Sequence, residues 1–395
     1  MEQNSQKSLD SNFFSVSFGL VLVHEPLPYG LFINSSTHAK RERFVCISKR
    51  KSILMPEDLI TFREKYYQLY IREEEREAYL KSIVSLGGVE DNAKVEVIKD
   101  SAIKYLESIF DQGRGFTNEV LEETIQGCRD SVESMIDVIQ DYGITDVQKL
   151  IAELSFHDFY TYDHSINVSM YSISILKALK PKATRKEMLL AGMGGLLHDL
   201  GKIKIPTSII NNPGKLSDTD FEIIKKHPEY GLELFDGNIG NHDDLDFETI
   251  KRVIGEHHEN YNGTGYPNKL EGKEISIFAR ITAIADFYDA ITTKRSYHEV
   301  LSTEDALNIM HRSVGRKIDP KIFDVFRNNV NVVLSGKTNK ELPDDFDPCQ
   351  PLNVLPLEKP EAKVQRSDFI KKETEDYGKV KTSSEKKKEK KKKAS

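Results

Sequence analysis

The sequence predicts a mainly α-helical protein with a smaller α+β module at its N-terminus. Apolar residues recur at helical spacing through residues 146–330, and Gly, Pro or Asn marks the helix ends. Residues 13–50 instead alternate apolar and polar side chains between turn signals, which is typical of short strands. The sequence after residue 335 is rich in Pro, Asp and Lys without sustained periodicity, so we expect a linker and a disordered Lys-rich tail there.

These patterns divide the chain into four predicted segments. In the α+β module, Pro56 opens a helix whose apolar face we expect to include Leu69 and Tyr70. The module, partly through residues 67–72, loosely resembles small regulatory domains, and this resemblance implies that it senses a signal or forms a homodimer. The four segments are residues 1–90 (the module), 91–145 (helical connector), 146–330 (helical catalytic domain) and 331–395 (linker and basic tail).

The composition is that of a soluble protein large enough for two domains, with 395 residues, 38% of them apolar and 30% charged. The chain has no run of 18 apolar residues and no basic-then-apolar N-terminal signal, so we expect neither a membrane span nor secretion. Its three cysteines lack motif spacing and are interpreted as free thiols. Together these features predict a cytoplasmic protein.

The net charge of −7 is unevenly distributed along the chain. Residues 371–395 contain 11 Lys and 5 Asp or Glu, a net of +6, which leaves −13 for residues 1–370. An acidic body argues against nucleic acid as the main partner. The run Lys386–Lys393 could contact an anionic membrane or RNA, but its like charge and low hydrophobicity favour a disordered solubilising tail.

Five histidines and two aspartates stand out in the helical domain. Small residues precede His198-Asp199, which indicates close helix packing that would bury this pair, and a buried charged pair needs partners or a metal. Each residue alone could be a hydrogen-bonded core residue, but the ordered series favours a centre for two divalent metals. The series is His164, His198, Asp199, His227, His257, His258 and Asp286.

A glycine-rich loop follows the second histidine pair directly, with the sequence Gly263-Thr264-Gly265-Tyr266-Pro267. The glycines allow positive φ and close backbone approach. Tyr266 can stack on a base or meet a protein partner, and Pro267 stiffens the exit of the loop. A plain connection explains glycine and proline, but not this whole string beside two histidines.

The ordered motifs resemble the HD-GYP family of the HD hydrolase superfamily over about residues 150–325. The motifs are His198-Asp199-Leu200-Gly201-Lys202, His257-His258-Glu259, Gly263-Thr264-Gly265-Tyr266-Pro267, and Asp286-Phe287-Tyr288-Asp289-Ala290 with Arg295 and Tyr297. The resemblance implies an all-helical HD-type bundle that hydrolyses the bacterial second messenger cyclic di-GMP to pGpG and, in some members, to GMP.

The resemblance also implies roles for individual residues. It places His164, His198, Asp199 and Asp286 around one metal and His227, His257 and His258 around the other, with Asp199 bridging. Some family members bind a third metal through a Glu where this chain has Tyr160, so we expect two metals. Iron or manganese is usual in the family, and the mixed ligand set does not exclude zinc.

We expect His198, Asp199 and Lys202 to be catalytic. Lys202 lies about one helical turn after the histidine–aspartate pair, where it can meet a phosphate oxygen or the leaving group; the alternative is a solvated lysine at a helix end. Arg295 could clamp a second phosphate or form a surface salt bridge. With Lys202 and Arg295, the expected substrate-binding residues are Gly265, Tyr266 and Pro267.

Three functions remain open at this point. The first is an active cyclic di-GMP phosphodiesterase, which the complete ligand set favours. The second is a catalytically weak receptor or scaffold that binds the nucleotide, or a GGDEF-domain protein through the Tyr266 loop. The third is an HD-type hydrolase that acts on another cyclic dinucleotide or on a nucleotide. This sequence has no GGDEF or EAL motif of its own.

Overall fold

The computed structural model describes residues 12–36, 43–110, 117–154, 160–210, 217–235, 245–293 and 301–330. They divide into two compact units, one up to Val97 and the other from Ile98 onward. Arg295 and the predicted linker and tail at 331–395 lie outside the described residues. No described helix combines the length and the apolarity that a bilayer crossing requires.

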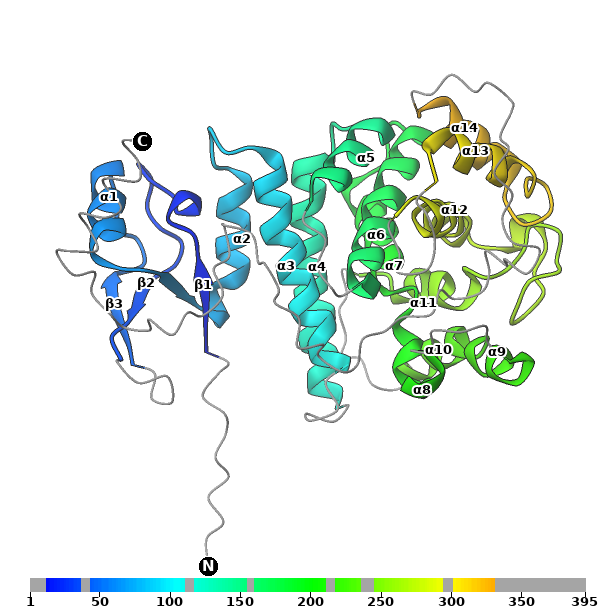
Figure 1. Ribbon diagram of the computed structural model, residues 1–395, viewed down its shortest axis with the longest axis horizontal. Coiled ribbons are helices and arrows are strands. Elements are labelled where there is room, and N and C mark those ends of the chain that lie inside the picture. Colours follow the sequence, from blue (N-terminus) through cyan, green and yellow to red (C-terminus); the bar gives the residue numbers. More distant parts are fainter. Residues whose placement is uncertain are drawn as a thin grey trace, which may run out of the picture. The chain divides into compact units, whose positions relative to one another are not determined.

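The first unit contains an antiparallel sheet with the strand order β1-β4-β2-β3, which confirms the predicted α+β module (Figure 1). Its core is aromatic and aliphatic, with Tyr29, Leu31, Leu69, Ile71 and Tyr79 almost completely buried. The elements are β1 (Phe13–Val16), η2 (Phe18–Leu20), β2 (Leu31–Asn34), β3 (Phe44–Ser48), α1 (Pro56–Lys65), β4 (Leu69–Arg72), η3 (Glu73–Glu75) and α2 (Arg76–Val84).

One expectation for this unit is wrong. Leu69 and Tyr70 do not share a helical face with Phe62, because α1 ends at Lys65 and β4 begins at Leu69. Tyr66 caps the helix in an extended conformation, and Leu69 and Tyr70 pair with Val16 and Ser15 across the sheet. Apolar spacing over so few residues fits a helix and a strand equally well, and the tertiary pairing decides between them.

Two long helices follow, α3 (Asp91–Phe110) and α4 (Asn118–Ile139), and then α5 (Ile144–Glu153). The boundary between the two units falls inside α3, so this helix runs unbroken from one unit into the other. Thr117 caps α4 by accepting a hydrogen bond from the amide of Val120.

The remainder of the second unit is helical, as predicted, and two antiparallel neighbours at its centre carry the site: α6 (Tyr160–Leu179) and α7 (Arg185–Leu197) (Figure 1). The other elements are η4 (Leu200–Lys204), α8 (Thr207–Ile210), α9 (Asp218–Ile224), α10 (His227–Phe235), α11 (Phe247–Glu256), η5 (Gly272–Glu274), α12 (Ile277–Thr292), α13 (Thr303–His311) and α14 (Pro320–Asn328). Of these, α12 packs against both central helices.

Small residues allow α7 to sit at the centre of this bundle. Every residue from Met188 to Leu197 is buried. A Cβ on Gly195 would come within 2.9 Å of the Cα of Ser169, so the main chains of α6 and α7 approach closely at this point. The close packing predicted from the small residues therefore brings the end of α7, where His198 and Asp199 lie, into the interior.

Candidate metal centre

His198 and Asp199 lie at the junction of α7 and η4, both buried. The Nδ1 of His198 donates a hydrogen bond to the carbonyl oxygen of Gly195 at 2.7 Å. Because a carbonyl can only accept, Nδ1 of His198 carries a proton and Nε2 is the nitrogen left to face a ligand. This Nε2 lies 3.3 Å from Oδ2 of Asp199. The pair thus offers one nitrogen and one carboxylate to the same small space.

Three further histidines surround the other oxygen of Asp199. His227 begins α10, and His257 and His258 directly follow α11. The Nδ1 atoms of His227 and His257 donate to the carbonyls of Ile224 and Ile254, both at 2.9 Å. Their Nε2 atoms therefore point at each other as lone pairs, 3.1 Å apart. Two facing lone pairs repel, and a shared cation removes that repulsion.

The protonation of these histidines fits a ligand role. Burial lowers the pKa of His227 and the pKa of His258 well below the usual range of histidine. Burial and the charge of His198 together lower the pKa of His257 to about 4. Burial would raise the pKa of Asp199, but the charges of His198 and Lys202 lower it well below its usual range. Neutral imidazoles around an ionised carboxylate are the forms that bind a metal.

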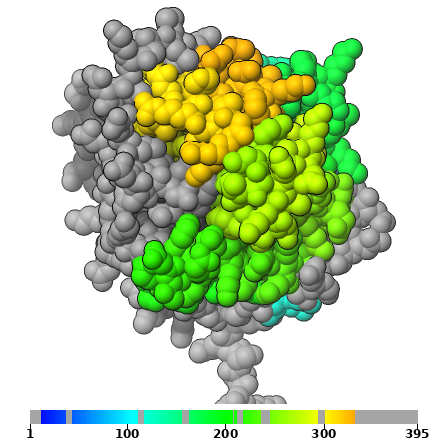
Figure 2. Space-filling model, turned by 90° about the vertical axis from the view of Figure 1, so that its right-hand side faces the viewer, coloured from blue at the N-terminus to red at the C-terminus, as the bar shows by residue number. Residues whose placement is uncertain are grey.

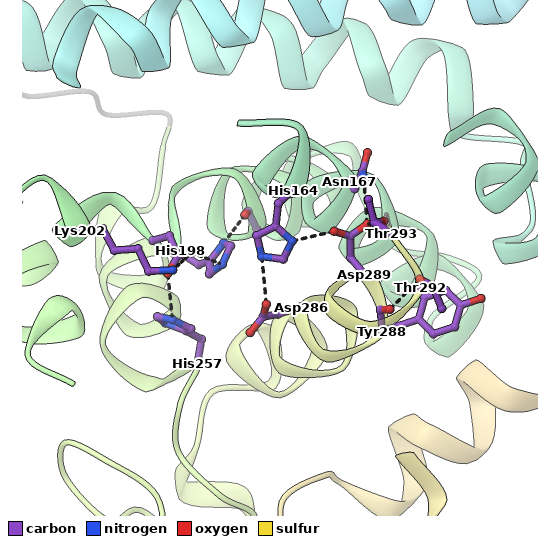
Figure 3. Close-up of polar contacts among 12 residues, drawn as sticks. His164, Asn167, His198, Lys202, His257, Asp286, Tyr288, Asp289, Thr292 and Thr293 are labelled. Carbon is purple, nitrogen blue, oxygen red and sulfur yellow. Dashed lines mark hydrogen bonds and ion pairs between the residues drawn. The ribbon is translucent and has the colours of Figure 1, made fainter. Parts of the chain in front are cut away.

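His164, in the first turn of α6, lies between two carboxylates of α12 (Figure 3). Its Nδ1 is 2.7 Å from Oδ2 of Asp289, and its Nε2 is 3.1 Å from Oδ1 of Asp286. Burial would lower the pKa of His164, but these two hydrogen bonds raise it to about 9. Burial would likewise raise the pKa of Asp286, and the hydrogen bond from His164 lowers it to about 2.

The structure brings all seven predicted ligand residues together, in two groups whose ligand atoms lie within 4.8 Å of one another. We call them the first group (His164, His198, Asp286) and the second group (Asp199, His227, His257, His258). The two groups meet at the adjacent residues His198 and Asp199. Nitrogen and carboxylate donors in this number suit iron, manganese or zinc.

Main-chain contact fixes the second group against η4. A Cβ on Gly201 would lie 1.9 Å from the carbonyl oxygen of His227 and 2.4 Å from the amide nitrogen of Gly231. The backbone of η4 therefore rests directly on the first turn of α10. Only glycine allows this approach at position 201.

Lys202 is buried and its Nζ lies 2.5 Å from Oδ2 of Asp199. The structure thus places this predicted catalytic residue at the histidine–aspartate pair, not in solvent. Because Lys202 pairs with Oδ2, Oδ1 is the oxygen of Asp199 that faces His227, whose Nε2 lies 3.4 Å away.

The glycine-rich loop closes over the second group. Tyr266 stacks on His258 with the ring centroids 5.0 Å apart and the planes 21° from parallel. Gly265 lets the chain pass close to the histidine pair, because a Cβ there would lie 2.2 Å from the amide nitrogen of Asn260. Pro267 continues the loop, and Nζ of Lys225 lies 5.5 Å from the centroid of the Tyr266 ring. On the face shown in Figure 2, the segment that contains the loop lies between α9–α10 and α13–α14.

Sequence reasoning missed two buried carboxylates that hold the site in place. Asp289 orients His164 and itself accepts hydrogen bonds from Asn167 at 2.9 Å and Thr293 at 2.7 Å. Glu259 accepts from the amides of residues 268 and 270, which ties down the far end of the loop. Asp289 was detectable, because it lies three residues after Asp286 on the same helical face.

Comparison with known proteins agrees with this geometry. Residues 147–322 match the HD domain family. The chain is 35% identical over 191 residues to a cyclic di-GMP phosphodiesterase of Pseudomonas aeruginosa, a match that covers 47% of this chain and 43% of the relative. It is 40% identical over 129 residues to 3'3'-cGAMP-specific phosphodiesterase 2 of Vibrio cholerae (33% and 24%), and 37% identical over 142 residues to a cyclic di-GMP phosphodiesterase response regulator of Xanthomonas campestris (36% of each).

The fold and the buried histidine–aspartate groups define a protein with an HD domain. The His198-Asp199 pair and the sequence Gly265-Tyr266-Pro267 agree with the resemblance of this domain to the HD-GYP family. The matches span less than half the length of each of these relatives.

Proposed function

We propose that this protein is a metal-dependent phosphodiesterase that hydrolyses cyclic di-GMP to pGpG, GMP or both. The observation that supports this most directly is the convergence of seven buried His and Asp side chains in two adjoining groups. The relatives named above are phosphodiesterases of cyclic dinucleotides, and phosphodiester hydrolysis is chemistry that two neighbouring metals perform.

The two groups would hold two divalent ions, iron or manganese, with Asp199 between them. Bound there, the ions would lower the pKa of a water and neutralise charge on the phosphate. Asp199 offers one oxygen toward His198 and the other toward His227. Lys202 holds Asp199 in this orientation and places a cationic Nζ beside the centre, where a phosphate oxygen would arrive.

The glycine-rich loop and Arg295 would complete the substrate site. Gly265 lets the loop backbone pack directly on residues 259 and 260, and the half-buried ring of Tyr266, which stacks on His258, would contact a base of the substrate. The loop is also the surface through which a GGDEF-domain protein would pair. Arg295 would contact the second phosphate of the cyclic dinucleotide.

We further propose residues 146–330 as the catalytic domain, 91–145 as a connector, 1–90 as a regulatory module and 331–395 as linker and tail. The module would promote homodimer formation in the cytoplasm. Oligomeric state and activity of the chain with and without residues 1–90 test this proposal; unchanged values in both would exclude it.

The decisive experiment is turnover by anaerobically purified, metal-analysed protein. Cyclic di-GMP, 3'3'-cGAMP and dNTPs are offered side by side with Fe(II) or Mn(II). We expect the wild-type protein to cleave cyclic di-GMP and the variants His257→Ala and Lys202→Met to lose this activity. The control is Lys204→Met, which should keep the activity because Lys204 pairs with Glu233. Cleavage of 3'3'-cGAMP or dNTPs alone would show that cyclic di-GMP is not the substrate. Nucleotide binding without cleavage would establish the receptor alternative.

A further inference from the structure

A buried ion pair outside the two ligand groups joins α3 to α6. Nζ of Lys99 lies 2.8 Å from Oδ1 of Asp163, and the two side chains are only 2% and 3% exposed. Lys99 is among the largest fully buried side chains of the chain, and its helix neighbours Ile98 and Ala102 are completely buried. Removing two charges from water is costly, so such a pair does not arise from packing alone.

The position of Asp163 connects this pair to the proposed metal centre. Asp163 directly precedes His164 in the first turn of α6. Consecutive helical residues point about 100° apart. One residue of this turn is therefore tied to α3 through Lys99, and the next is tied to α12 through Asp286 and Asp289.

Both ring nitrogens of His164 are engaged by α12, so the orientation of its ring is determined there. These contacts of the ring do not by themselves fix the position of the His164 main chain. A buried ion pair resists a shift of the turn along or around the helix axis, because any shift would separate the two charges.

We propose that Lys99 is a positioning residue: through Asp163 it holds the first turn of α6 and thereby sets the place of His164 in the first group. The inference rests on the proposed metal centre.

The test separates positioning from general stability with three variants. Lys99→Met leaves Asp163 buried without this partner, so we expect a lower Tm and a 10- to 100-fold weaker metal affinity at one of two sites, about the effect of losing a ligand's outer partner. Lys99→Met/Asp163→Leu removes both charges, so Tm should recover while the affinity loss remains. Lys99→Arg, which keeps the charge, should restore much of that affinity.

The matched control is Lys94→Met. Lys94 lies on the same helix and pairs with Asp91 of that helix, not with α6. We expect both metal affinities to be unchanged in this control.

A second readout needs no metal. In chelator-treated protein at a fixed pH, the imidazole ¹⁵N signals of His164 should move in the double variant, whereas those of His257 stay in place. Unchanged His164 signals, or affinities that fall equally at both sites and follow Tm, would overturn the inference. If the wild-type protein cleaves no cyclic dinucleotide but His164 responds as described, the proposed function fails and the positioning role stands.

Discussion

The two ligand groups differ in what holds their histidines. In the second group, His227 and His257 donate to main-chain carbonyls three residues earlier, so the local helix end fixes each ring. In the first group, His164 is held by Asp286 and Asp289, more than 120 residues away in the chain. The second group is therefore built on local backbone geometry, whereas the first combines His198, which is held in the same local way, with His164, which is held by side chains that the fold brings together.

The two kinds of support have opposite electrostatic effects. The carboxylates raise the pKa of His164 to about 9, whereas burial without such partners lowers the pKa of His227, His257 and His258. At neutral pH and without metal, His164 is therefore a cation paired with Asp286 and Asp289, whereas His227, His257 and His258 are neutral imidazoles. A metal must displace a proton to enter the first group but not the second.

Removing Asp199, the residue proposed to lie between the two metals, should have the largest effect. Asp199→Ala deletes the oxygens that face His198 and His227, so we expect turnover to fall by at least about 10³-fold and metal to be lost from both groups. Steady-state kinetics and metal analysis measure this. His311→Ala, at an exposed histidine of α13, is the control, and metal loss from one group alone would show that Asp199 does not bridge.

The outer partner of His164 should affect one group only. Asp289→Asn weakens the hydrogen bond that orients His164, so we expect metal affinity of the first group to fall about 10- to 100-fold. Calorimetric titration with Mn(II) should show one weakened and one unchanged site. Equal weakening of both sites would contradict the separation of the groups.

Tyr266 should have a smaller effect, confined to the second group. Tyr266→Leu removes the ring stacked on His258, a contact worth about 0.5–1.5 kcal/mol, so metal affinity there should fall at most about tenfold. Tyr266→Phe retains the ring and should bind metal as the wild type does. Loss of turnover in Tyr266→Phe with normal metal binding would instead assign the hydroxyl to the substrate.

The mildest test changes only pH. In chelator-treated protein, His164 has a folded pKa of about 9 against 6.5 unfolded, so its stabilisation is complete below pH 6.5 and is lost as the pH rises through 9. His257, lowered to about 4, destabilises the fold as the pH falls from 6.5 toward 4. Urea unfolding should therefore be most difficult near pH 6.5, and His164→Gln should lack the alkaline decline. A flat profile up to pH 9 would contradict the salt bridge.

The sequence was informative where local pattern determines structure. Helical spacing predicted the bundle, and the order of histidines and aspartates predicted which side chains meet. It failed at residues 66–70, where the spacing fits two conformations and pairing with β1 selects the strand. Lys99 escaped notice because a charged residue on a helix is normally solvated, and only the fold shows that it is buried beside Asp163.

The contact at Gly201 leaves the junction of η4 and α10 little room to move, because main chain touches main chain and no side chain there could move aside. Under the proposed function, a nucleotide entering beside the second group would instead displace the ring of Tyr266 that stacks on His258. Variants that aim at a different base preference should therefore change the loop over His258 and keep Gly201.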